Sequence, residues 1–213
     1  MHIFFDIETA PDKKYEELSP WMKSLWKDRY CKKMKEWTTP EEHYYNTAWL
    51  YAEYSKILCI SAWYFKDDWT KDINTFHKKE ETENIRDFFN KTHKHKLAWF
   101  NIKWFDMAFM CKRAAMSWLK IPFNINHIGK KPRDSDVLDL METWKFWWWM
   151  GASLGLACEA MWIESPKWEI QWNMMWVYYH SDEFNIEKVV AYCENDVRAT
   201  MELYEKTKKY FTS

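Results

Sequence analysis

The chain has 213 residues, 47% apolar and 30% charged, which is the balance of a globular protein with enough apolar side chains for its own core. Its 31 Lys and Arg residues against 32 Asp and Glu residues give a net charge of −1, which excludes binding of nucleic acid or lipid through a large cationic excess, although bound metal ions can still supply positive charge locally. No run of about 18 uncharged apolar residues is present, which excludes a membrane span, and five scattered cysteines without a CxxC pair indicate reduced thiols in a cytoplasmic protein.

The first half of the sequence predicts two long strands separated by a helical insertion. Residues 2–7, HIFFDI, form a short apolar run typical of a buried strand. Residues 11–54 are mostly polar and helix-prone, and Thr39-Pro40 followed by two glutamates is a typical helix start. A long strand is expected over 56–65, with its hairpin partner at 71–77.

The second half of the sequence alternates helices and strands. Residues 80–92 place Ile85, Phe88 and Phe89 on one helical face, and 185–209 carry a longer apolar stripe. This alternation after two leading strands predicts an α/β fold with a mixed sheet flanked by helices, in a single domain over 1–213. The expected elements are helices at 80–92, 105–118, 152–162 and 185–209 and strands at 96–100 and 136–141.

Two acids lie at the end of the first predicted strand. Asp6 and Glu8 are separated by one residue, so their side chains point to the same face of the strand while Ile7 points to the other. Carboxylates beside an apolar strand are costly unless a cation or a proton neutralises them. Taken alone, the pair is also explained by a solvated strand end.

Two further acids lie in predicted helices. Asp106 falls in the first turn of its helix, where the helix dipole stabilises an acid without any further function. Tyr192 and Asp196 are spaced i and i+4 in the last helix and therefore share a face beside the apolar stripe. A surface aspartate beside a half-buried tyrosine would give the same pattern.

The combination of these acids is more informative than any of them alone. Asp6, Glu8, Asp106 and Asp196 come from three elements that can converge at one edge of the sheet. Four carboxylates gathered without a cation would repel one another strongly. Hard oxygen ligands of this kind suit Mg²⁺ or Mn²⁺ rather than zinc. The sequence therefore predicts a divalent metal site.

Three segments, FFDIET, FNIKWFD and YCENDV, resemble in this order the three exonuclease motifs of the DEDD superfamily, which has a ribonuclease-H-like fold. The tyrosine four residues before the last aspartate is similar to the DEDDy branch. The DEDDh branch would carry a histidine where this chain has Ala191. Residues 39–61 and 128–146 are similar to stand-alone predicted 3′–5′ exonucleases related to the proofreading domain of family B polymerases.

The resemblance implies a two-metal site. In it, Asp6, Glu8 and Asp196 hold one divalent ion, and Asp6 also reaches the second, with Asp106 helping mainly through water. One ion lowers the pKa of a water molecule and the other stabilises the leaving 3′ oxygen. Tyr192 orients the attacking water, since a phenol with an ordinary pKa near 10 is a poor base. The positions that match a grip on the single-stranded 3′ end are Thr9, Asn101 and Phe105.

The activity implied is that of a metal-dependent 3′–5′ exonuclease on DNA that uses two Mg²⁺ or Mn²⁺ ions and releases nucleoside 5′-monophosphates. No polymerase domain fits in 213 residues, so we expect the protein to act alone or with a polymerase or repair partner in trans. One alternative is the same reaction on RNA, because no group that reads the 2′-hydroxyl is identifiable. The other is a nucleic-acid-binding module of the same fold without catalytic activity.

The chain has 17 tryptophans and only 3 glycines, whereas average usage would give about 15 glycines. Tryptophan often stands where the family usually carries glycine, and at turns where glycine supplies a positive φ. One hypothesis is that UGA, which some bacterial lineages read as glycine, has been translated as tryptophan. UGG codons at these positions would refute it. The alternative is a protein that is genuinely rich in tryptophan. The positions are Trp49, Trp63, Trp69, Trp99, Trp104, Trp118, Trp147, Trp148, Trp149, Trp162 and Trp172.

Trp104 matters most for activity, because it lies between Asn101 and Asp106. If it is a true tryptophan, its indole is expected to block the nucleic-acid groove or to displace Asp106. If it is a glycine, the site is left open.

Overall fold

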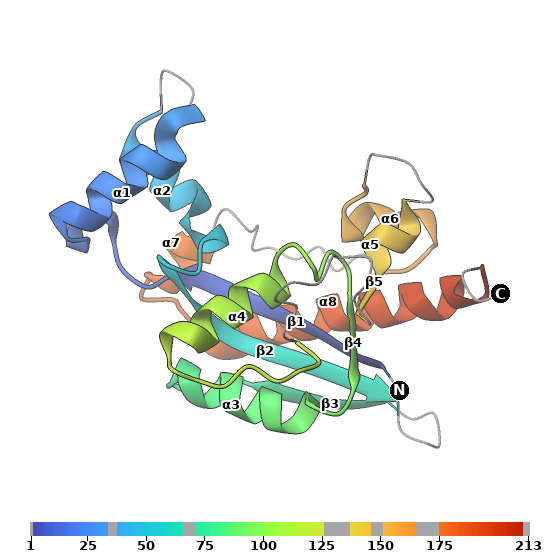
Figure 1. Cartoon of the computed structure of the whole chain (residues 1–213). Helices are drawn as coiled ribbons and strands as arrows, with labels where there is room; N and C mark the ends of the chain where they lie inside the picture. The colour runs from blue at the N-terminus through green and yellow to red at the C-terminus, as the bar shows by residue number, and fades with distance from the viewer. Residues whose placement is uncertain are drawn as a thin grey trace.

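Five strands form one mixed sheet in the order β3-β2-β1-β4-β5 (Figure 1). The computed structural model describes residues 2–33, 38–65, 71–125, 137–145, 151–164 and 175–210. β1 pairs antiparallel with β2 and parallel with β4, β2 pairs antiparallel with β3, and β4 pairs parallel with β5. The mixed α/β sheet confirms the predicted fold class. The strands are β1 (His2–Pro11), β2 (Ser55–Phe65), β3 (Lys71–Phe76), β4 (Lys96–Trp99) and β5 (Leu138–Asp139).

The central strand β1 is longer than the predicted 2–7. Its ladder with β2 continues past the acids to Ala10 and Pro11, with a register shift between Glu8 and Thr9. The polar residues that suggest a strand end are instead buried, because α8 (Ile186–Thr207) packs over this part of the strand. A bulge of this kind re-aims side chains and is common beside active sites.

Helices cover both faces of the sheet (Figure 1). Alternate β1 side chains contact opposite layers: the Phe5 ring lies 4.8 Å from that of Phe88, and the Phe4 ring lies 5.2 Å from that of Tyr204. Phe88 belongs to α3 (Glu81–Thr92) and Tyr204 to α8. The even-numbered face of β1, which also carries Asp6 and Glu8, is therefore the α8 face.

The predicted insertion forms an arm that extends away from the sheet, drawn in blue in Figure 1. It begins after Pro11 rather than at residue 11. The capping box of Thr39 and Glu42 confirms the predicted helix start. The arm has its own apolar cluster around the fully buried Trp26, whose indole N–H donates to the carbonyl of Pro40 at 3.0 Å. Its helices are η1 (Tyr15–Glu17), α1 (Pro20–Tyr30), η2 (Cys31–Lys33), α2 (Pro40–Thr47) and η3 (Ala48–Leu50).

The predicted strand over 136–141 is wrong beyond Asp139. β5 has two residues, and α5 (Leu140–Trp144) begins at once because the Asp139 carboxylate accepts hydrogen bonds from the amides of Met141 and Glu142. The short helix α7 (Met175–Tyr179) is not predicted by the sequence pattern. The remaining helices are α4 (Asp106–Met116), α6 (Leu154–Ala160), α7 (Met175–Tyr179) and η6 (Lys208–Tyr210).

Several sequence features lie outside the described residues: the connection between the two strands of the predicted hairpin, which includes Trp69, the tryptophans 147–149, and Trp172. In the part of the chain that the structure does describe, no helix has both the length and the apolar character needed to cross a bilayer. The five cysteines are free thiols.

Two of the tryptophans at expected glycine positions end helices in a left-handed conformation. Trp118 follows α4 with φ 57°, and Trp162 follows α6 with φ 51°. Their amides, and those of the next residues, donate back to the last helical turn, as in the Schellman motif. That position usually holds glycine, because a Cβ is strained there. The backbone therefore supports the glycine hypothesis at both sites.

Replacing either tryptophan by glycine is expected to stabilise the protein by about 1 kcal/mol, because the left-handed strain disappears. Little burial is lost, since the two side chains are 95% and 88% exposed. The measurement is the free energy of unfolding in denaturant. Trp21 is the matched control: it is exposed but lies inside α1, so Trp21→Gly should destabilise by up to about 1 kcal/mol. Equal effects at all three positions would contradict the backbone argument.

Candidate active site

The first two acids of the site come from the α8 face of β1. Asp6 is 3% exposed and Glu8 is fully buried. Both carboxylate oxygens of Glu8 lack a hydrogen-bond partner among the described residues. An ionised carboxylate is not stable in such a place without a cation. The buried carboxyl group of Glu8 therefore needs a proton or a nearby cation to neutralise it.

Helix α8, which packs on this face of β1, supplies Tyr192 and Asp196. Asn185 caps the helix through the Glu187 amide, and its apolar stripe packs on β1 and β2. Burial, and then the charges of Asp196, Glu8 and Asp6, raise the pKa of Tyr192. Its hydroxyl also donates a hydrogen bond to Asp196, which favours the ionised form of the aspartate. Burial nevertheless raises the pKa of Asp196 to about 7, and its Oδ1 has no partner among the described groups.

Asp106 reaches the same place from the start of α4. It is 3% exposed, and its carboxylate accepts hydrogen bonds from its own backbone and that of Ile7. These bonds and a side-chain bond to Asp6 favour its ionised form. Burial outweighs them and raises its pKa to about 8. The acid is therefore more than a helix-capping charge.

The electrostatics of the cluster follow from burial and from the mutual repulsion of its members. Burial, then the charges of Asp106 and Asp196, raises the pKa of Asp6 well above its ordinary value. Burial, then the charge of Asp6, does the same for Glu8. Among the described residues, none of the four acids forms an ion pair with a basic side chain. The four carboxyl groups are therefore stable together only when they bind protons or added cations.

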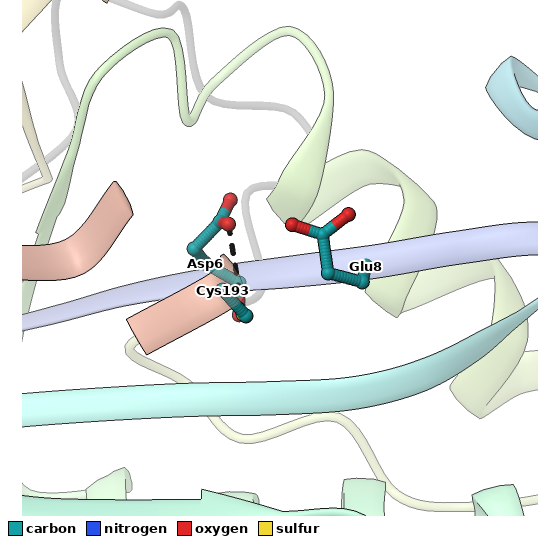
Figure 2. A group of neighbouring side chains, drawn as sticks. All are labelled: Asp6, Glu8 and Cys193. Atoms are coloured by element: carbon teal, nitrogen blue, oxygen red, sulfur yellow. Dashed lines mark hydrogen bonds between the residues drawn. The ribbon is translucent and has the colours of Figure 1, made fainter. Parts of the chain in front are cut away.

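Cys193 of α8 lies against Asp6, as Figure 2 shows. Its thiol is 3.5 Å from the carbonyl oxygen of Asp6 and 3.6 Å from Oδ2. One potential ligand atom from each of Asp6, Glu8 and Cys193 lies within 4.8 Å of the others. The sequence analysis missed this contact. The spacing of three residues between Cys193 and Asp196 could have indicated this contact, because it places both residues on the side of α8 that faces the sheet.

Three of the acids, Asp6, Asp106 and Asp196, open onto a cavity of about 660 Å³, whereas Glu8 is fully buried and does not line it. Asn101 and Phe105, two of the positions expected to grip the 3′ end, line it. Thr9 does not: it is 1% exposed, and its hydroxyl donates to the carbonyl of Trp49 at 2.9 Å. The other lining residues are Asp6, Trp49, Leu50, Trp99, Phe100, Asp106, Met141, Ala152, Ser153, Leu154, Gly155, Tyr192 and Asp196.

Trp104 does not displace Asp106, contrary to the expectation for a true tryptophan. Its side chain is 69% exposed and is not part of the cavity wall, and Asp106 keeps its place beside Asp6. Two other tryptophans at expected glycine positions, Trp49 and Trp99, do line the cavity. The Trp49 ring lies 5.9 Å from that of Phe105, edge to face. Whether positions 49 and 99 hold tryptophan or glycine therefore decides which side chains form part of the cavity wall.

A mixed sheet in this strand order, with helices on both faces and acids from β1, α4 and α8 beside one cavity, defines an α/β protein of the ribonuclease-H-like class. Residues 47–212 match the family of predicted 3′–5′ exonucleases related to the exonuclease domain of family B DNA polymerases, and the chain belongs to that family. This confirms the resemblance. The matched range does not include β1. Asp6 and Glu8 are therefore assigned to the site by their positions in the structure and not by the family match.

A family B DNA polymerase from the hyperthermophilic archaeon Pyrobaculum calidifontis has a similar structure, with a TM-score of 0.57 and 15% sequence identity. The similarity covers 96% of this chain and 24% of the polymerase, so this chain spans about a quarter of the polymerase's length. At this identity the likeness concerns the fold. No curated protein matches the sequence.

Proposed function

We propose that the protein is a metal-dependent 3′–5′ exonuclease that shortens single-stranded DNA from its 3′ end. The observation that carries this proposal is the convergence of four buried acids, of which Asp6, Asp106 and Asp196 line one cavity and Glu8 lies beside Asp6. Oxygens of Glu8 and Asp196 in this cluster have no hydrogen-bond partner among the described residues. Oxygen ligands of this type fit Mg²⁺ or Mn²⁺. Asp6, Glu8, Asp106 and Asp196 would hold the ions. Bound there, two divalent ions supply a hydroxide at neutral pH and stabilise the departing 3′ oxygen.

The other side chains have distinct roles in this proposal. Tyr192 keeps its proton because its pKa is raised by burial and by the nearby acids, so it orients water as a hydrogen-bond donor and does not act as a base. Asn101 offers an amide to the terminal nucleotide. Phe105 offers a ring on which a base can stack, a contact worth about 1–3 kcal/mol in other proteins. Thr9 would act only indirectly, by fixing the Trp49 carbonyl.

DNA is the proposed substrate because the family is related to the exonuclease domain of a DNA polymerase. The same proposal includes a cytoplasmic location, a single-domain organisation, and a polymerase or repair protein that acts with this protein in trans. An exoribonuclease and an inactive nucleic-acid-binding module are the two alternatives, each of which gives a different result below.

The test uses 5′-labelled single strands of matched DNA and RNA sequence with Mg²⁺, Mn²⁺ or EDTA. We expect a ladder of products shortened from the 3′ end, faster on DNA, and none in EDTA. A circular single strand, which has no 3′ end, should stay intact. Faster shortening of RNA would favour the ribonuclease. Binding without shortening in either metal would favour the inactive module.

A further inference from the structure

Asp139 is a buried acid that the proposed reaction does not use. It is the last residue of β5, 3% exposed, and it pairs with Trp99 in the parallel ladder with β4. The chain leaves β4 at Trp99 and runs through Asn101 and Phe105 to Asp106. Asp139 thus lies beside the segment that carries Asn101, Phe105 and other cavity-lining residues into the site.

The Asp139 carboxylate joins this segment to α5 by backbone hydrogen bonds. Oδ1 accepts from the amide of Asn101 at 2.9 Å, and Oδ2 accepts from the amide of Lys103 at 3.3 Å. Oδ1 also accepts from Met141 and Glu142 at the start of α5, at 3.0 and 3.4 Å. Both oxygens are therefore engaged, which distinguishes Asp139 from the unpaired Glu8.

The backbone held in this way has an unfavourable conformation. Asn101 has a φ of 71°, in the left-handed region that side chains other than glycine rarely adopt. Such a conformation persists only where the surroundings fix it. A second tie lies close by, because the ammonium of Lys103 is 2.6 Å from a carboxylate oxygen of Glu142 in α5.

We propose that Asp139 is a positioning residue that fixes Asn101 and Phe105 in the arrangement that receives the 3′ end of the strand. This inference rests on the proposed function. In this arrangement Asp139 contacts neither the DNA strand nor the metal ions. Its loss should weaken the grip on the nucleotide and leave the four-acid cluster able to bind ions.

The test compares wild type with Asp139→Asn and Asp139→Ala. Asparagine keeps one acceptor and the helix cap, whereas alanine loses all four bonds. For single-stranded DNA we expect KM to rise by about 10- to 100-fold in the alanine variant, less in the asparagine variant, with a smaller change in kcat. The affinity for Mn²⁺, titrated without DNA, should stay unchanged. Amide hydrogen exchange at Asn101 and Lys103 should accelerate in both variants.

Asn84→Ala is the matched control for lost stability. Asn84 is fully buried and holds the backbone of Lys78 by two hydrogen bonds, with no part in the cavity wall. It should lower stability without raising KM. An equal rise of KM in this control, an unchanged KM in Asp139→Asn despite faster exchange, or unchanged exchange would overturn the inference. A wild-type protein that neither binds nor shortens DNA overturns the proposed function first, and the exchange data then still report whether Asp139 holds the loop.

Discussion

Replacing Asp6 by asparagine is expected to slow 3′ shortening on the order of 10³-fold or more, while the protein stays folded. Asp6 has the most central place in the cluster. After burial, the charges of Asp106 and Asp196 are the next causes that raise its pKa, its own charge is the next cause after burial for Glu8, and Cys193 contacts it. Asparagine has nearly the same shape but cannot supply a charged ligand. The measurement is the single-turnover rate on a labelled strand at saturating Mn²⁺.

Two companion variants separate the loss of a metal ligand from general damage. Asp196→Asn should be about as severe as Asp6→Asn. Tyr192→Phe should be milder, roughly 10²-fold, because it removes a hydrogen-bond donor and leaves all four acids. Circular dichroism and thermal unfolding establish that each variant is folded. A folded Asp6→Asn protein with the wild-type rate would remove the metal assignment, and an unchanged rate in Tyr192→Phe would remove its role in orienting water.

Without divalent metal, the stability of the protein is expected to fall as the pH rises from about 4 to 8. Burial raises the pKa of Asp196 to about 7 and that of Asp106 to about 8, whereas in an unfolded chain aspartate titrates near pH 4. Between these limits the folded state binds more protons than the unfolded state, so the free energy of unfolding decreases with pH. The contribution is complete below about pH 4 and lost above the folded pKa values.

Divalent ions should reverse this trend, because they bind the ionised carboxylates of the folded chain. At 100 times its Kd, one ion adds about 2.7 kcal/mol to the free energy of unfolding. Thermal unfolding between pH 5 and 9, with EDTA or with Mn²⁺, measures both effects. We expect a large metal-dependent rise in Tm at pH 8 and a small one at pH 5, where protons compete.

Glu8→Gln is the informative variant for this titration, since it removes a fully buried acid with no partner among the described residues. It should raise the metal-free Tm at pH 8 and reduce the increment from Mn²⁺. Glu183→Gln changes an exposed acid in the loop before α8 and should alter neither. A metal-free Tm independent of pH, or the same Mn²⁺ increment in wild type and Glu8→Gln, would contradict the buried-acid account.

The acids of the site could be predicted from sequence because their relations are local. Asp6 and Glu8 share a face through the two-residue period of a strand, and Tyr192 and Asp196 share one through the helical period. The structure places both pairs as expected, with Asp106 beside them. Periodicity could not show that Glu8 would be fully buried, because that depends on α8, which is remote in the sequence.

The features that were missed depend on partners far along the chain. Residues 136–141, DVLDLM, are mostly apolar in a way that suits a strand, yet the chain turns into a helix after Asp139. The Asp139 carboxylate decides this by binding both the α5 amides and the amide of Asn101, which is 38 residues away. The cavity wall likewise combines Trp49 with Met141 and Leu154, and no local pattern links them.

The position of α8 has a consequence for the protein during its synthesis. The ribosome extends the chain from its N-terminal end, and a domain generally folds as a unit. Asp6 and Glu8 emerge first, but Tyr192 and Asp196 follow almost 190 residues later, on the helix that also covers Phe4. A chain that ends before α8 therefore holds three of the four acids and lacks Asp196 and Tyr192. The proposed nuclease activity would therefore require that translation has passed α8.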